Sequence, residues 1–449
     1  MVDEGAEVTR SGDKPDLGRY LERLDPSTTA ARLKGRVREV TGLVVRASAP
    51  GVTIGELVEI EARSGPLQAQ VVGFKDELAV LMPLGPLDGV GPQSAITATG
   101  EPPRILCGRG LLGRVLDGLG RPMDGLGALG GAELRPWALD RAPPDPMRRQ
   151  RIVEPFCTGV RAIDGLMTLG VGQRVGLFAE SGVGKSFLMG RLARDAEADV
   201  AVICLVGERG REVRDFIEDS LGLRGLERSV VVCATSDAPG LVRLKAASVA
   251  TSIAEFFREE GLRVLLMMDS VTRLAQAQRE VGLAAGEPPV RRGFPPSAFS
   301  MLPRLLERAG QGERGSITAI YTVLVAEDAM GDPIADEVRS ILDGHIVLSR
   351  ALAQRAHHPA IDPLRSLSRL MGAVTDAPHR RAAEAFRRAL ATYEARRDLI
   401  AMGAWTRGAD PALDEAVDMI EEMEAFLLQE PEEASALEAT VDHLRDLFG

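Results

Sequence analysis

The sequence has few aromatic residues, few cysteines and no long apolar run. Aromatic residues make up 4% of its 449 residues, so the base-stacking surfaces of nucleic-acid-binding proteins would be scarce. The four cysteines lack metal-ligand spacing, and Cys204 and Cys233 stand in apolar runs, which predicts buried free thiols. The longest apolar runs are far shorter than a membrane span, and the polar N-terminus lacks the apolar centre of a secretory signal. We therefore expect a cytoplasmic protein.

The sequence also lacks the basic excess that is typical of nucleic-acid-binding proteins. Its net charge is −11. Residues 408–449 hold 13 acidic residues and 1 basic residue, a charge of −12, so the other 407 residues sum to +1. The acidity therefore belongs to the C-terminal segment, which either meets a basic partner or forms a solvated helical face. We expect no nucleic-acid partner.

Composition divides the chain into four parts. Residues 1–28 are charged and predict a flexible arm with one short helix near LGRYLERL. Residues 29–100 contain short runs rich in Val, Ile and Leu between Gly and Pro, a pattern typical of a small β-barrel or sandwich. Residues 101–375 begin with a Gly- and Pro-rich stretch and, from about residue 173, alternate apolar strands with amphipathic helices, which predicts a mainly parallel sheet covered on both faces. Residues 376–449 have helical periodicity and predict a helical C-terminal domain.

The clearest motif is AESGVGKS at 179–186, between the apolar run RVGLFA and a helix-forming segment. Strand, glycine-containing turn and helix start form the context that a phosphate-binding loop requires. Gly182 and Gly184 allow the backbone to turn its N–H groups inward. Lys185 can reach the β- and γ-phosphates, and the Ser186 hydroxyl can bind Mg²⁺. The first position is Ala179 rather than Gly, so the alternative is a chance GKS in a turn.

Two carboxylates follow other predicted strands. Asp269 ends the run RVLLMMD, and a carboxylate at the carboxyl end of such a strand is the second Mg²⁺ ligand that a phosphate loop requires. Glu208 follows AVICLV and could polarise an attacking water. The alternatives are a helix cap for Asp269 and an ordinary charged surface turn for Glu208.

Together with other segments of the chain, these motifs resemble those of the ATPases of type III protein export. The resemblance rests on AESGVGKS, GERGREVRDFI, ATSDAPGLVRLKAA, LLMMDSVTRLAQAQREVGLAAGEPPVRRGFPPS and DEVRSILDGHIVLSR, and it runs from about residue 33 to residue 430. The group comprises the flagellum-specific export ATPase and its injectisome relatives, and it is similar to the catalytic subunit of rotary ATP synthases. The resemblance implies an α/β fold: a RecA-like P-loop NTPase core, an N-terminal β-barrel and a helical C-terminal domain.

The resemblance also implies roles for residues. Glu208 matches the family's catalytic carboxylate, beside which Arg209 is expected near the γ-phosphate. Arg369, which closes SLSR, matches the arginine finger that reaches into the neighbouring subunit's site. His358, before a proline, stands where an aromatic residue usually stacks on adenine. The alternative for His358 is a loop residue without a ligand.

The expected catalytic residues are therefore Glu208, Lys185, Arg209 and Arg369, and the expected Mg²⁺ ligands are Ser186 and Asp269. The residues expected to bind ATP are Ala179, Glu180, Ser181, Gly182, Val183, Gly184, Lys185, Ser186, Phe187 and His358.

The resemblance implies that the protein hydrolyses ATP with Mg²⁺ and thereby energises export of flagellar proteins across the inner membrane. The alternatives are an injectisome ATPase, or a ring subunit that binds nucleotide with weak or no turnover. Because Glu208 and Arg369 lie on one chain, a homo-oligomeric ring is expected, most simply a hexamer. The implied partners are a stator-like regulator on the N-terminal arm, a central stalk protein, substrate–chaperone complexes and the membrane export gate.

Glu180 is the main departure from the family's phosphate loop, where Gly is common. A Glu at a backbone position with positive φ would cost about 1–2 kcal/mol. A carboxylate ~8 Å from a phosphate would repel it by about 2 kcal/mol at an effective dielectric near 20. We therefore expect a functional site of reduced affinity, in which Glu180→Gly leaves ATP binding unchanged or tightens it.

Overall fold

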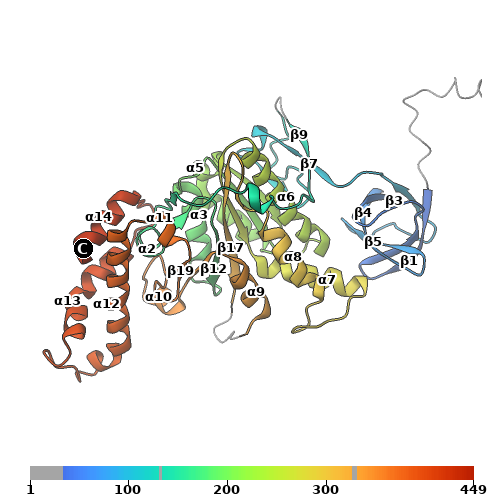
Figure 1. Ribbon diagram of the computed structural model, residues 1–449. Helices are drawn as coiled ribbons and strands as arrows, with labels where there is room; N and C mark the ends of the chain where they lie inside the picture. Colours follow the sequence, from blue (N-terminus) through green and yellow to red (C-terminus); the bar gives the residue numbers. More distant parts are fainter. Residues whose placement is uncertain (1–33, 131–133, 326–330) are drawn as a thin grey trace, which may run out of the picture.

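A β-barrel, a central α/β part and a helical C-terminal part follow one another along the molecule (Figure 1). This computed structural model describes residues 34–130, 134–325 and 331–449. The predicted arm over residues 1–28, with its short helix, lies outside the described residues. The α/β class, the barrel and the helical C-terminal part are as the sequence predicts.

The N-terminal strands close into a six-stranded antiparallel barrel with the order β1-β2-β5-β4-β3-β6. Alternation along each strand sends one set of side chains inward. In β3, for example, Val58 and Ile60 are fully buried, whereas Glu59 and Glu61 between and after them are not. The sheet closes because β6 pairs with both β1 and β3, which makes a barrel rather than a sandwich. The strands are β1 (Lys34–Thr41), β2 (Val44–Ser48), β3 (Leu57–Ala62), β4 (Gly65–Lys75), β5 (Leu78–Pro83) and β6 (Ala95–Ala98).

The central part is built on a nine-stranded, mainly parallel sheet with the order β19-β18-β12-β17-β15-β13-β14-β8, and β16 pairs with β17. Only the short strands β16 and β19 pair in the antiparallel sense. The strands are β8 (Val115–Asp117), β12 (Arg174–Ala179), β13 (Val200–Val206), β14 (Ser229–Ala234), β15 (Arg263–Asp269), β16 (Gly310–Gln311), β17 (Ser316–Leu324), β18 (Gly344–Val347) and β19 (Leu367–Ser368).

Both faces of this sheet are buried, which explains why its strands are predominantly apolar. Along β13, Val202 and Cys204 join one hydrophobic core, while Ile203 and Leu205 join the core on the opposite face. The first core holds α6 (Gly240–Glu259), α7 (Val271–Ala285), α8 (Pro296–Leu306) and α9 (Pro333–Ile341). The second holds α2 (Arg161–Leu166), α3 (Lys185–Asp195) and the helical stretch α4 (Gly210–Asp215), η3 (Phe216–Leu221) and α5 (Gly222–Glu227).

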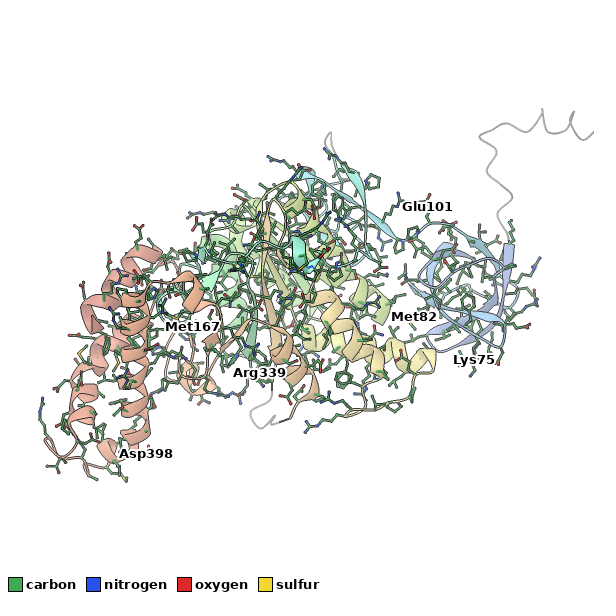
Figure 2. The ribbon with its side chains drawn as sticks, viewed as in Figure 1. Lys75, Met82, Glu101, Met167, Arg339 and Asp398 are labelled. Atoms are coloured by element: carbon green, nitrogen blue, oxygen red, sulfur yellow. The ribbon has the colours of Figure 1, made fainter. Side chains whose placement is uncertain are left out.

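Short elements connect these layers. Two small antiparallel pairs are β7 (Arg104–Cys107) with β9 (Arg135–Ala138), and β10 (Pro155–Phe156) with β11 (Leu169–Gly170). The remaining short helices are η1 (Arg109–Leu111), η2 (Pro146–Arg148), α10 (Arg350–Gln354) and α11 (Met371–Val374). Met82 of the barrel, labelled in Figure 2, is 3% exposed and belongs to a core that includes central strands, so the barrel packs directly on the central part.

The C-terminal part consists of α12 (Ala377–Ala401), α13 (Pro411–Leu427) and α14 (Leu437–Phe448). Asp376 and Asp410 cap the first two of these helices, because their carboxylates accept hydrogen bonds from first-turn amides. Asp398 lies near the outer tip of this part (Figure 2). None of the described helices is both long and apolar enough to cross a lipid bilayer.

Residues 428–435, which we call the return segment, connect α13 to α14 and run back against α3. Arg191 of α3 donates hydrogen bonds to the carbonyls of Gly159 and Glu433. Arg161 pairs with the Glu433 carboxylate and donates to the Leu428 carbonyl. The return segment is thereby fixed to α3, the helix that follows the phosphate loop.

A buried ion pair inside the central part predicts a large effect on stability. Arg308 donates two hydrogen bonds of 2.8 Å to the carboxylate of Glu255 on α6, and both side chains are at most 5% exposed. Glu255→Gln would leave the guanidinium buried without its counter-charge, which typically costs about 3–5 kcal/mol. We expect a clear fall in the urea midpoint of unfolding.

The matched control for this substitution is Glu394→Gln on α12. Glu394 pairs with Arg397 at 3.7 Å, and its side chain is 38% exposed. Exposed pairs contribute about 0–1 kcal/mol, so this midpoint should scarcely move. Equal midpoints for the two variants would contradict the prediction.

Candidate active site

The phosphate loop joins the carboxyl end of β12 to the amino end of α3. Gly182 and Gly184 have φ of 82° and 86°, a conformation that favours glycine. No side chain caps the start of α3, so its first amides remain available. Free amides and the helix dipole at this end favour an anion.

Lys185, in the first turn of α3, lies between two carboxylates. Its Nζ is 2.5 Å from Asp269 Oδ1 and 3.7 Å from Glu208 Oε1. Asp269 ends β15 and Glu208 follows the adjacent strand β13, in which Leu205 pairs with Asp269. Parallel strands thus bring an ammonium and two acids, from three separate segments, to one edge of the sheet.

Asp269 does not cap the next helix. Ser270 has that position, since its side chain accepts a hydrogen bond from the Arg273 amide at the start of α7. Asp269 is 3% exposed, and its carboxylate accepts a hydrogen bond of 2.7 Å from the Thr322 hydroxyl. Thr322 and Lys185 therefore both hold the Oδ1 atom of this carboxylate.

Glu208 lies in a partly buried position rather than in an exposed turn. Burial, followed by the nearby Asp269 carboxylate, raises the pKa of Glu208 to about 7, although Lys185 opposes this shift. The backbone at Glu208 is fixed as well, because its carbonyl accepts a hydrogen bond of 3.0 Å from the Ser236 amide. A carboxyl group with a pKa near neutrality in such a position can accept a proton.

Both predicted catalytic arginines lie outside the cluster of Lys185, Glu208 and Asp269. Arg209 precedes α4, and its side chain is 83% exposed and paired with Glu212. Arg369 follows β19, and its amide donates to the Asp343 carbonyl just before β18 begins. It therefore lies at the amino-terminal edge of the sheet, opposite the edge that carries the phosphate loop of the same chain.

A cavity of about 460 Å³ lies beside the phosphate loop. Val183 and Phe187 line it from the loop and α3, His358 lines it from the segment after α10, and Leu428 lines it from the return segment. Phe187 is 41% exposed, so part of its ring faces the opening. Apolar and aromatic walls next to a phosphate loop suit a nucleotide base.

Glu180 has an ordinary backbone conformation and an ion-pair partner. It is not among the described residues with positive φ, so the backbone cost does not arise. Its Oε2 lies 3.3 Å from Nε of Arg350 at the start of α10. The acid is therefore paired.

The donor groups at this site fit Mg²⁺. Ser186 and Asp269 offer a hydroxyl and a carboxylate oxygen, and Mg²⁺ beside phosphates needs only one or two such protein ligands. In the described part of the chain, no three His, Cys, Asp or Glu side chains gather into a site that could hold a metal by themselves. A metal here would depend on the phosphates for its remaining ligands.

Sequence reasoning missed four contributors to this region: Thr322, Glu212, Arg350 and the return segment. Glu212 sits in the first turn of α4, where its carboxylate accepts a hydrogen bond from the Arg209 amide. The segment GERGRE already contains this second glutamate, four residues after Glu208, so a local signal for it exists. The other three contributors reach the site through contacts between segments that are far apart in the sequence, and no local sequence pattern indicates such contacts.

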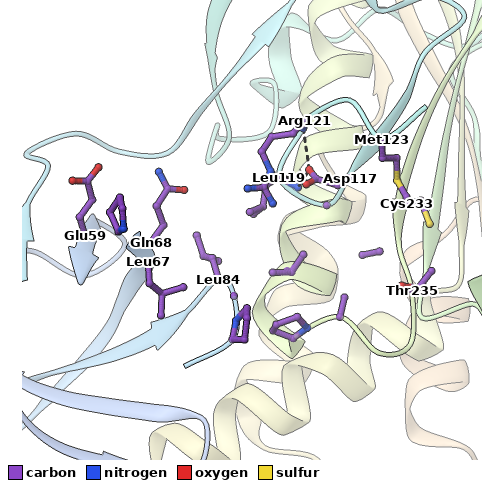
Figure 3. Close-up of a pocket in the computed structure, with 18 residues that line it drawn as sticks. Glu59, Leu67, Gln68, Leu84, Asp117, Leu119, Arg121, Met123, Cys233 and Thr235 are labelled. Atoms are coloured by element: carbon purple, nitrogen blue, oxygen red, sulfur yellow. Dashed lines mark hydrogen bonds and ion pairs between the residues drawn. The ribbon is translucent and has the colours of Figure 1, made fainter. Parts of the chain in front are cut away.

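A second cavity, of about 640 Å³, lies between the barrel and the central sheet (Figure 3). Glu59 and Gln68 line it from the barrel side, and the Asp117–Arg121 ion pair and Thr235 line it from the other side. It lies at the carboxyl ends of β8 and β14, several strands away from the phosphate loop. We therefore assign the nucleotide to the smaller cavity.

Comparison with protein families gives three matches in succession along the chain. Residues 37–100 match the β-barrel domain of the ATP synthase alpha/beta family, and residues 159–368 match its nucleotide-binding domain. Residues 375–446 match the C-terminal domain described as that of the T3SS EscN ATPase. The three matches follow the barrel, the central sheet and the C-terminal helices.

Individual relatives resemble the chain over nearly its whole length. The type 3 secretion system ATPase of Xanthomonas euvesicatoria is 53% identical, over 96% of this chain and 98% of the relative. The flagellum-specific ATP synthase of Bacillus subtilis is 51% identical, over 94% and 97%. The solved structure of the assembled ATPase EscN with its central stalk EscO, from the type III secretion system of enteropathogenic E. coli, has a TM-score of 0.86 at 46% identity. That match covers 92% of this chain and 100% of EscN.

Proposed function

Since the chain belongs to the ATP synthase alpha/beta family and carries the C-terminal domain of a type III secretion ATPase, we propose that it hydrolyses ATP to energise type III protein export. The observation that carries the proposal is the convergence of Lys185, Glu208 and Asp269 beside the phosphate loop. A subunit that only binds nucleotide needs no carboxylate such as Glu208 to orient an attacking water.

In this proposal the phosphate loop, 179–186, holds the triphosphate with its amides, and the Lys185 ammonium moves from the carboxylates to the β- and γ-phosphates. Glu208, thereby released from Lys185, accepts a hydrogen bond from the attacking water and orients it towards the γ-phosphorus. Val183, Phe187 and His358 hold the base in the adjoining cavity. Arg209 is exposed beside Glu208 and is able to swing towards the γ-phosphate.

Ser186 and Asp269 are the residues that would hold Mg²⁺. When bound, the metal would neutralise charge on the phosphate oxygens as the bond to the leaving group breaks. Thr322 fixes the orientation of the Asp269 carboxylate by its hydrogen bond of 2.7 Å.

We further propose that the active form is a homo-oligomeric ring, most simply a hexamer, with each site completed by Arg369 of the neighbouring copy. The position of Arg369 at the opposite edge of the sheet supports this, because it is far from its own phosphate loop in the topology. The structure of the similar protein EscN has been solved as an assembled ATPase and in complex with its central stalk EscO. A stalk protein, a stator-like regulator on the N-terminal arm, substrate–chaperone complexes and the export gate are the partners proposed for this chain.

We assign the export pathway to the flagellum, at the cytoplasmic face of the inner membrane. The segments EVRSILDGHIVLSR and GEPPVRRGFPPS favour it by resemblance. Relatives named for the flagellum and for secretion have nearly equal identity, 51% and 53%, so they do not separate the two pathways. Deletion of the gene distinguishes them: loss of filaments and motility supports the flagellar assignment, and loss of effector secretion with intact motility contradicts it.

A phosphate-release assay on the purified chain tests the enzymatic proposal. We expect steady release of phosphate from ATP with Mg²⁺ and none without a divalent metal. Tight nucleotide binding without phosphate release, in the assembled state, would support a ring subunit without turnover.

The raised pKa of Glu208 predicts the pH dependence of the reaction. Below a pKa of about 7 the carboxyl group is protonated and cannot accept a proton from water. The value of kcat/KM should therefore fall about tenfold per pH unit below that point and level off above it. Steady-state kinetics from about pH 5 to about pH 9 would record this limb.

Nucleotide also titrates in this range, so the dissociation constant of a non-hydrolysable ATP analogue should be measured at the same pH values. The prediction concerns the fall in kcat/KM at low pH that remains after the change in this dissociation constant is taken into account. A limb near pH 4 would mean that Glu208 is ionised throughout the neutral range, contrary to the prediction.

A further inference from the structure

The phosphate loop of this chain contains an acidic residue, Glu180, and the order of the strands places an arginine, Arg350, next to it. Glu180 is the first residue after β12, and Arg350 follows closely after β18. The two strands are parallel neighbours, with Phe178 opposite Val347. The Leu348 amide donates to the Phe178 carbonyl at 2.8 Å, so the two segments leave the sheet side by side.

The two side chains meet outside the sheet edge. Arg350 Nε lies 3.3 Å from Glu180 Oε2. The carboxylate side chain is 17% exposed, whereas the guanidinium side chain is 44% exposed. Water therefore screens the acid less than it screens the base, and Glu180 depends on Arg350 for its counter-charge.

An unpaired carboxylate here would oppose the function of the loop. A carboxylate about 8 Å from a phosphate, at an effective dielectric near 20, would weaken nucleotide binding about thirtyfold. Because the Glu180 backbone lacks positive φ, this charge is the main difference from a glycine at the same position.

Arg350 also lies on the segment that forms one wall of the base cavity. Leu348 precedes it, and Ala356 and His358 follow it along that wall. The Ser349 amide donates to the Ala360 carbonyl at 2.8 Å and closes this segment into a loop. The cation is thus fixed beside both the phosphate loop and the base cavity.

We propose that Arg350 is a positioning residue for ATP that acts through Glu180: it neutralises the acid in the phosphate loop and so keeps this loop able to bind a triphosphate. The inference rests on the proposed function, since it concerns the same nucleotide site. It makes the effect of Arg350 conditional on the presence of Glu180.

The experiment is a double-mutant cycle on binding of a non-hydrolysable ATP analogue. Arg350→Gln should weaken binding about tenfold. This is less than the thirtyfold effect of an unpaired carboxylate given above, because the pair is partly exposed to water. Glu180→Gln should bind at least as tightly as wild type. In the Glu180→Gln background, adding Arg350→Gln should weaken binding clearly less than it does in wild type, because no carboxylate is then released that could turn towards the phosphates.

Two further measurements separate neutralisation from a structural role. Arg350→Lys keeps the charge and should restore most of the affinity. The loss in Arg350→Gln should shrink as salt is raised, because ions screen the partly exposed acid. A loss that is unaffected by both salt and lysine would instead indicate a packing role and would overturn the proposal.

The proposal is also overturned if Arg350→Gln weakens binding equally in the wild-type and the Glu180→Gln backgrounds, since Arg350 would then act on the nucleotide directly. Wild-type affinity in Arg350→Gln would overturn it too. Failure of the wild-type chain to bind the analogue is a different result, because it would remove the proposed function itself.

Discussion

Glu208→Gln is expected to lower the kcat of ATP hydrolysis by about 10²–10⁴-fold while leaving nucleotide affinity within about threefold. Gln keeps the size of the side chain and one oxygen, but it cannot take a proton. The side chain lies 3.7 Å from the Lys185 ammonium at the phosphate loop, close enough to orient a water at the γ-phosphate. The loss should therefore appear in kcat rather than in binding.

The control is Glu218→Gln, the same substitution in the helical stretch that follows Glu208. Glu218 pairs with Arg214 on the surface, and its side chain is 57% exposed. Its rate should stay near that of wild type. Retention of more than about a tenth of the wild-type kcat in Glu208→Gln would assign the reaction to another group.

Arg369→Ala should reduce turnover by about 10³–10⁵-fold, although this residue lies far from its own phosphate loop. It follows β19 at the amino-terminal edge of the sheet, where its Nη2 donates to the Arg339 carbonyl at 3.4 Å. A large effect from such a position would require that the residue serve a neighbouring copy.

Mixing two inactive chains tests that requirement directly. In a ring assembled from equal parts of Arg369→Ala and Glu208→Gln chains, about one interface in four combines an intact Glu208 with an intact Arg369. Activity should therefore return to about a quarter of the wild-type rate. Mixing either chain with the double variant should restore nothing, and absence of rescue in the first mixture would argue against shared sites.

Much of the fold follows from local patterns. The apolar runs that end in Ala179, Val206 and Asp269 form strands β12, β13 and β15, because burial on both faces favours a nearly continuous run of apolar residues. Cys204 and Cys233 are 0% and 2% exposed, as their apolar neighbours predict. Short runs rich in Val, Ile and Leu between Gly and Pro indicated the barrel strands but could not separate a barrel from a sandwich, since closure depends on which strands become neighbours.

What the sequence could not provide is contact between distant segments. The short strand β8 lies in a Gly- and Pro-rich stretch without a strand-like pattern, yet it extends the central sheet beside β14. Thr322 faces Asp269 only because β17 lies next to β15. Arg350 reaches Glu180 only because β18 lies next to β12. Each depends on strand order, which the sequence alone does not specify.

The return segment has a consequence for synthesis of the protein. Glu433 of this segment contacts Arg191, which lies 242 residues earlier in the chain. A ribosome therefore makes the phosphate loop long before it makes Leu428, which forms part of the wall of the base cavity. A nascent chain therefore has phosphate-binding amides but an open base cavity. Products terminated before residue 428 should have lower affinity for nucleotide and compete poorly with finished subunits for ATP.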